Sequence, residues 1–219
     1  MIRRAFGLLG VAVVLAGALS ACARPDFQYT ADKPGTAPAG TVYFKVPSGW
    51  SQFPAKQIQA AESSWVTDTT AKTVLDATTW QEAYDAAPQP SLDHVLGAST
   101  PQHPVVYASL RTLYQEESAV TDASLRDMVV PVSTLGSKVE VRTDEKVRQG
   151  SATGLHLVFS FTPRDGLPEE TIDQTAYLSE GKDAVYLLVV RCTSDCYRTN
   201  ADAIRSVTSS YTIQEGRRG

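Results

Sequence analysis

The sequence predicts an α+β domain built on a twisted, mainly antiparallel sheet flanked by helices. Most of the expected strands follow one another through turns, without the helices of ten or more residues that parallel crossovers require. Of 219 residues, 42% are hydrophobic and 20% are charged, a balance typical of a globular domain with a real core. We therefore expect one domain over residues 41–214, followed by a polar tail at 215–219.

The strand and helix signals of the first half are short. We expect a strand at 41–46, a tight turn at Pro47–Trp50, a helix over 55–64, and strands at 65–67 and 79–85. Trp80 and Tyr84 share one face of the last of these strands. Four prolines between residues 86 and 104 predict a long surface loop.

The second half is richer in strands. We expect strands at 105–114, 138–148, 154–162 and 171–178, a short helix beginning at Thr121 or Asp122, a helix over 195–211 and a last strand at 211–213. The continuously apolar run at 184–191 (AVYLLVVR) predicts a central strand covered on both faces.

The first 21 residues have the pattern of a signal peptide. Two arginines at positions 3 and 4 precede fifteen uncharged apolar residues, fewer than the about 20 that a transmembrane helix needs. The general secretory route is the expectation, and the paired arginines leave twin-arginine export open.

Leu19-Ser20-Ala21-Cys22 resembles a bacterial lipobox, in which small residues precede a cysteine whose thiol accepts a diacylglyceryl group. We expect lipidation of Cys22 and anchoring at the extracytoplasmic face of the cell membrane. The alternative is conventional cleavage near Ala23, which would leave Cys22 without a role. Residues 22–40 are rich in Pro, Gly, Ala and Thr and predict a flexible tether.

Three segments together resemble a group of lipoproteins of high-GC Gram-positive (actinobacterial) bacteria with a PsbP-like fold. They are Phe44–Trp50 (FKVPSGW), the apolar strand Val185–Val190 and the closing segment Ala201–Tyr211 (ADAIRSVTSSY). The resemblance implies an antiparallel sheet flanked by helices, an α/β/α sandwich, used mostly as a scaffold for binding other macromolecules. It supplies no catalytic motif.

Cys192 and Cys196 are the only thiols left if Cys22 is acylated, and an extracytoplasmic compartment preserves disulfides. We expect a structural disulfide between them. A zinc site would need about two more ligands, and a redox site would favour a C-x-x-C spacing.

The three histidines are weak candidates for chemistry. His94, next to Asp93, and His103 flank the proline-rich loop and could bind a transition metal, but solvated loop histidines are the expectation. His156 should lie opposite Leu155 and Leu157, facing solvent or covered by a helix. A Gly-x-Ser-x-Gly motif, a P-loop and a Rossmann glycine pattern are absent.

The net charge of −4 argues against nucleic acid as a partner, because counterion release requires basic patches. We therefore expect a non-catalytic binding or scaffold domain for a cell-envelope or protein partner, with no cofactor or metal. One alternative is an envelope hydrolase whose site residues are scattered in the sequence. Another is a carrier of an apolar ligand, which would need a cavity between sheet and helices.

Overall fold

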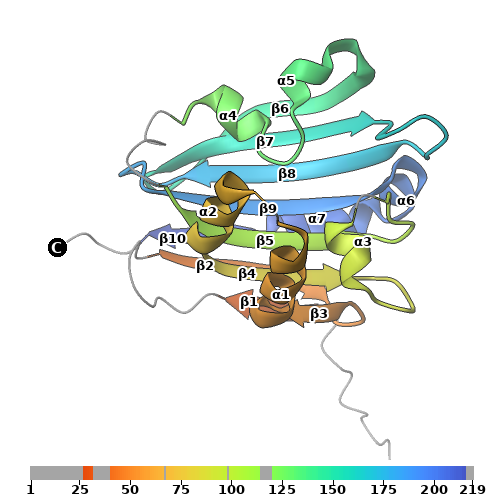
Figure 1. The fold of residues 1–219 in the computed structure, drawn as a ribbon, viewed down its shortest axis with the longest axis horizontal. Helices are drawn as coiled ribbons and strands as arrows, with labels where there is room; N and C mark the ends of the chain where they lie inside the picture. Colours follow the sequence, from red (N-terminus) through yellow and green to blue (C-terminus); the bar gives the residue numbers. More distant parts are fainter. Residues whose placement is uncertain (1–26, 32–39, 67, 98, 114–119, 216–219) are drawn as a thin grey trace, which may run out of the picture.

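The computed structural model describes residues 27–31, 40–66, 68–97, 99–113 and 120–215 (Figure 1). Their strands form a seven-stranded sheet in the order β3-β4-β5-β9-β8-β7-β6 and a three-stranded sheet in the order β1-β2-β10. All the strand pairs are antiparallel. This confirms the α+β class. The division into two sheets was not predicted.

The strand boundaries are as follows: β1 Phe27–Ala31, β2 Gly40–Pro47, β3 Ser51–Pro54, β4 Thr78–Asp85, β5 Val105–Thr112, β6 Val139–Gln149, β7 Ala152–Phe161, β8 Glu170–Leu178, β9 Ala184–Thr193 and β10 Thr212–Glu215. The α-helices are α1 Ala55–Trp65, α2 Thr69–Ala77, α3 Leu92–Leu96, α4 Asp122–Arg126, α5 Val132–Leu135, α6 Ser194–Thr199 and α7 Ala201–Ser209, and a 3-10 turn covers Gly136–Lys138.

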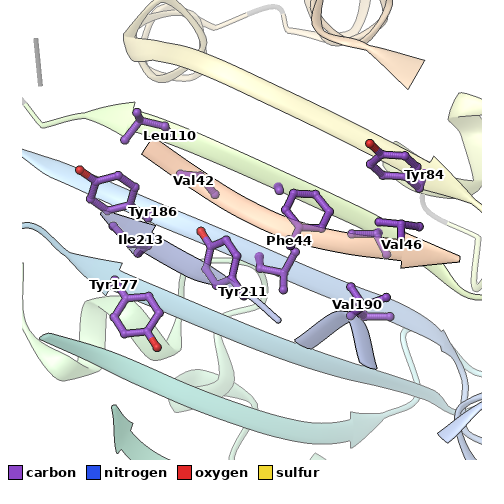
Figure 2. Close-up of a cluster of buried hydrophobic side chains, with 14 of the residues drawn as sticks. Val42, Phe44, Val46, Tyr84, Leu110, Tyr177, Tyr186, Val190, Tyr211 and Ile213 are labelled. Atoms are coloured by element: carbon purple, nitrogen blue, oxygen red, sulfur yellow. The ribbon is translucent and has the colours of Figure 1, made fainter. Parts of the chain in front are cut away.

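The seven-stranded sheet separates two layers. On one face, α1, α2 and α3 pack over β3, β4 and β5, and α4 packs over β7. The three-stranded sheet lies on the other face, together with α6 and α7. The largest core fills the space between this second layer and the large sheet, where Phe44 of β2 packs edge-on against Tyr84 and Tyr211 (Figure 2).

β9 is the middle strand of the large sheet, as its apolar sequence predicts. Because side chains alternate along a strand, Tyr186, Leu188 and Val190 point into the largest core. Val185, Leu187 and Val189 point to the opposite face, toward the helices α1 to α5. The two faces of this strand therefore have different surroundings.

Four sequence expectations are wrong at the level of elements. Residues 27–31, expected in the flexible tether, form β1 and pair with β2. Residues 65–66 end and cap α1 instead of forming a strand, and α2 follows. The loop 86–104 contains α3. The single helix expected over 195–211 is two helices that meet at Asn200, whose side-chain amide donates to the carbonyl of Cys196 over 2.9 Å.

Within the described residues, the helices are too short or too polar to span a bilayer.

Candidate functional site

A groove of about 750 Å³ lies on the helical face of the large sheet, over its two central strands. Its floor consists of alternate side chains of β5 and β9, from Val105 to Arg111 and from Val185 to Arg191. The walls come from α1, α2 and α3 on one side and from the region of α4 on the other, the arrangement that Figure 1 shows from the front. This volume lies within the range of small-ligand sites, which is roughly 300–1,000 Å³.

The floor is apolar in part: Val105, Val185, Leu187 and Val189 alternate with the hydroxyl-bearing Tyr107 and Ser109, and Arg111 and Arg191 lie at its two ends. Val189 and Leu187 line the groove and are 5% and 8% exposed, so the floor is narrow and shielded from bulk water. From Val105 to Arg111 the groove runs along the strands for about 20 Å. An elongated apolar chain therefore fits this shape better than a compact polar molecule.

The rim of the groove is also apolar. Among the described residues, four large hydrophobic side chains are exposed: Tyr43, Val74, Val129 and Val141. Two of these four, Val74 of α2 and Val129 just beyond α4, line the groove. Exposed apolar side chains gathered around a concavity indicate a binding surface, whereas isolated ones need no explanation.

One wall carries a chain of buried polar groups. The Tyr107 hydroxyl donates to Gln81 Oε1 over 3.0 Å, and Gln81 Nε2 donates to Glu62 Oε2 over 3.1 Å. Burial raises the pKa of the Glu62 carboxyl, although hydrogen bonds from Gln81 and Tyr107 lower it in part. Burial and the nearby Glu62 also raise the pKa of Tyr107. The groove wall thus offers one carboxyl group in an apolar setting, next to a phenol that stays protonated.

Arg191 fixes the end of the groove beside α3. Its Nε lies 2.5 Å from Glu170 Oε1, and its terminal nitrogens donate to the carbonyls of Gly97 and Ser99. Burial raises the pKa of the Glu170 carboxyl, and Arg191 opposes that effect. Both side chains are mostly buried and form an ion pair, while the terminal nitrogens of Arg191 hold the backbone of the segment after α3 against the sheet.

A second, smaller cavity of about 200 Å³ brings together both histidines of the proline-rich segment. His94 Nδ1 lies 2.7 Å from Asp85 Oδ2, and Ser99 and His103 line the same cavity. The partner of His94 is thus Asp85 and not its sequence neighbour Asp93. Asp85 is 1% exposed and also accepts hydrogen bonds from the backbone amides of Ala87 and Ser91, so it organises the whole turn after β4.

This smaller cavity has only part of what catalysis or metal binding needs. A hydroxyl at hydrogen-bond distance from His94 is not found among the described residues, and a nucleophile would need one. No group of three or more His, Cys, Asp or Glu side chains arranged to hold a metal ion occurs in the described part of the chain.

His156 lies opposite Leu155 and Leu157, as expected, and is covered in part by α6. Its Nε2 is 3.0 Å from Asp173 Oδ1, and the Tyr197 hydroxyl donates to Asp173 Oδ2 over 2.7 Å. The hydrogen bond to Asp173 raises the pKa of His156 more than burial lowers it. This cluster is on the face of the sheet opposite the groove and has no part in it.

Cys192 and Cys196 are bonded to each other in the structure, with their Cα atoms 6.0 Å apart. Cys192 lies near the end of β9 and Cys196 lies in α6, so the bond joins the central strand to the helices that follow it. Cys22, the expected lipidation site, lies outside the described residues. Trp50 is partly buried against the largest core.

The groove itself was not predicted as a site. Tyr107, Leu187 and Val189 belong to strands that the sequence places correctly, but the continuous apolar run at 184–191 predicted a strand covered on both faces. One of those faces is the groove floor. The available signal was an excess of apolar residues on β5 and β9 relative to the short, polar helices that could cover them.

Comparisons with known proteins support the fold. No family model matches the sequence, and no curated protein matches it. Among solved structures, LpqN of Mycobacterium tuberculosis, described as involved in cell envelope biogenesis, has a TM-score of 0.50 at 17% identity, covering 87% of this chain and 92% of LpqN. At this identity the likeness concerns the fold alone.

Two further solved structures are similar at lower scores. The cyanobacterial PsbP protein of Synechocystis has a TM-score of 0.48 at 10% identity, covering 91% of this chain and 99% of that protein. The Ran-binding protein Mog1p of Saccharomyces cerevisiae has a TM-score of 0.43 at 10% identity, covering 84% and 94%.

Proposed function

We propose that this protein is a membrane-anchored, extracytoplasmic lipoprotein whose groove binds the apolar chain of a cell-envelope component. The groove over β5 and β9 carries the proposal, because it combines a shielded apolar floor with exposed valines on its rim. Binding an apolar chain there would remove the apolar surfaces of the groove and of the ligand from water, which stabilises the complex by about 25 cal/mol for each Å² of apolar surface buried.

Two observations support a ligand from the cell envelope. The lipobox at Leu19–Cys22 predicts attachment to the outer face of the cell membrane, where apolar envelope molecules are available. LpqN, which has a similar fold, is described as acting in cell envelope biogenesis. The expected binding role and the alternative of an apolar-ligand carrier thus become one function, in which the bound envelope component is an apolar ligand.

A position for the polar part of such a ligand also exists. Glu62 and Tyr107 line the groove and are joined through the buried Gln81, so that a ligand hydroxyl or amine could donate to the Glu62 carboxylate. Burial within the wall leaves few water molecules to compete for that carboxylate, and a hydrogen bond to a charged group contributes about 1.5–3 kcal/mol. This contact would set the register of the ligand along the groove.

The proposal is tested by the binding of a fluorescent long-chain fatty acid to rim variants. Val74→Glu and Val129→Glu place a negative charge where the anionic fatty acid would lie, and each should weaken binding about fourfold or more, since burial of a single methylene is worth about 0.8 kcal/mol. Both positions are exposed, so the variants should fold. Val141→Glu is the matched control, because Val141 is also exposed but lies on β6 outside the groove lining. Equal affinity in all three variants would contradict the proposal.

Hydrolysis is a second candidate function because Asp85 and His94 form a carboxylate–imidazole pair in a cavity shared with Ser99. Apo sites often show longer contacts between nucleophile and base than active complexes do. Turnover of a chromogenic acyl ester that is lost in both Ser99→Ala and His94→Gln would support this function. Absence of turnover in the native protein leaves Asp85–His94 as a structural pair.

A further inference from the structure

The first strand of the domain begins only five residues after Cys22. β1 starts at Phe27 and pairs with β2 from Phe27 opposite Pro47 to Ala31 opposite Tyr43. Gln28 Nε2 donates to the carbonyl of Trp50 over 2.9 Å, and the Lys45 ammonium lies 4.7 Å from the centre of the Phe27 ring. β1 is therefore held to the body of the domain at its first two residues.

The short spacing limits how far the domain can move from a lipid on Cys22. Five residues span at most about 17 Å even when fully extended. A flexible tether of residues 22–40, as the sequence predicted, would have let the domain float and rotate freely above the membrane. With β1 in place, the end of the domain that contains Phe27 has to stay close to the lipid headgroups.

Strand register identifies the rest of that end. Pro47, opposite Phe27, leads through the turn at Pro47–Trp50 into β3, whose Ser51 pairs with Asp85. Asp85 pairs with Val105, and Val105 pairs with Arg191. The segment 86–104 and the α3 end of the groove thus lie at the same end of the molecule as the start of β1. The β8–β9 turn at Glu180 lies at the opposite end.

We propose that the domain is held on the bilayer with this end facing the lipid, so that the α3 end of the groove is the end nearest the membrane. The proposal rests on the lipid anchor of the proposed function. Its partner is the surface of a phospholipid bilayer, fixed by the length of chain between Cys22 and Phe27. Exposed side chains at this end carry both signs, among them Asp93, Glu169, Arg164 and Arg198, so the orientation should depend little on salt.

The test measures the height of two labelled positions above a membrane. The full-length protein is purified from cell membranes, its acylation is checked by intact mass, and it is placed in vesicles of phosphatidylglycerol and phosphatidylethanolamine that carry an energy-transfer acceptor on the headgroup. Gln89→Cys labels the segment 86–104, and Glu180→Cys labels the far end. Both positions are exposed, and the native cysteines of the domain are bonded to each other. The two ends are about 30 Å apart, the length of β9.

The expected result is several-fold greater transfer from position 89 than from position 180. A control protein with a long Gly/Ser insertion between Arg24 and Pro25 should lose this difference while remaining acylated. Equal transfer from the two positions in the acylated native protein would overturn the orientation but leave the anchor intact. Absence of acylation would instead refute the anchor and, with it, the orientation, while groove binding is tested separately by the rim variants.

Discussion

At the scale of single residues, His156 is the clearest source of pH dependence in the domain. Its imidazole faces Asp173, which is 4% exposed and also accepts a hydrogen bond from the Tyr197 hydroxyl. Other groups near it are Glu145 on β6 and Arg142 and Arg205 near Tyr197. The hydrogen bond with Asp173 raises the pKa of His156 in the folded state above 6.5, its ordinary value.

The expected consequence is a pH-dependent difference in stability between the native protein and His156→Gln. A raised folded pKa means that protonated His156 stabilises the fold fully below its unfolded pKa, and that this contribution disappears as the pH rises through the folded pKa. Urea unfolding should show the variant less stable by about 1 kcal/mol near pH 5.5 and a smaller difference near pH 8.5. A difference that is constant across this range would show that the ion pair adds nothing to stability.

Sequence reasoning at this scale succeeded where chemistry is local and failed where partners are distant. The pairing of Cys192 with Cys196 follows from two thiols separated by three residues. His94 instead pairs with Asp85, nine residues away, because β4 and α3 bring them together after a turn that Asp85 itself organises. The network of Glu62, Gln81 and Tyr107 joins three elements, and the sequence gives no sign that these residues meet.

At the scale of elements, the disulfide fastens the C-terminal helices to the central strand. α6 and α7 supply Cys196, Ile204 and Val207 to the largest core, where they pack beside β2. The closed loop is short, so the bond removes little entropy from the unfolded chain.

We therefore expect the double variant Cys192→Ala and Cys196→Ala to lose about 2 kcal/mol of unfolding free energy by the chain-entropy model. Guanidinium unfolding of the native protein with its disulfide intact, and of the purified double variant, measures this loss. Fatty-acid binding at a temperature where both are folded should be unchanged, because the cysteines lie on the face opposite the groove. A large loss of affinity in the variant would mean that the two faces of β9 are coupled.

The elements that were missed share one physical cause, which is weak local preference. Three of the nine residues of α2 are threonines, whose β-branched side chains favour strands, so its helix depends on packing over β4 and β5. α3 has five residues and is held by the Ser91 cap and by Asp85. The strands β4, β5 and β9 were predicted well because long alternating or continuous apolar patterns carry more information than short helices do.

The segment 86–104 was expected to be a long surface loop. Its Val95, Thr100, Pro101 and Pro104 are buried, and Arg191 holds its backbone. The segment therefore forms part of the core beside β5.

At the scale of the whole molecule, the groove lies on the helical face of the large sheet, over its two central strands. The sequence indicated the anchor and the sheet, but it could not show the groove. The groove forms between the helices α1, α2 and α3 and the region of α4, over the two central strands, and this depends on the order of strands in the sheet.

The anchor leads to a prediction for Cys22→Ala. If the thiol of Cys22 carries the diacylglyceryl group, the variant should move from the membrane fraction to the soluble extracytoplasmic fraction, because an anchor of two or more acyl chains holds a protein stably and its loss leaves no comparable attachment. Cell fractionation followed by immunoblotting measures this shift, with the double variant Cys192→Ala and Cys196→Ala as a control that keeps Cys22. An unchanged membrane share of Cys22→Ala would refute lipid anchoring at this residue.

The central claim, that the groove over β5 and β9 holds an apolar chain, is tested most directly by photolabelling. The protein is irradiated with a long-chain fatty acid that carries a diazirine near the end of its chain, and labelled peptides are sequenced by mass spectrometry. The account predicts labels on the groove-facing residues of β5 and β9, such as Tyr107, Leu187 and Val189, and their loss when excess unlabelled fatty acid is added. Labels confined to other surfaces, or labels that excess fatty acid does not remove, would contradict it.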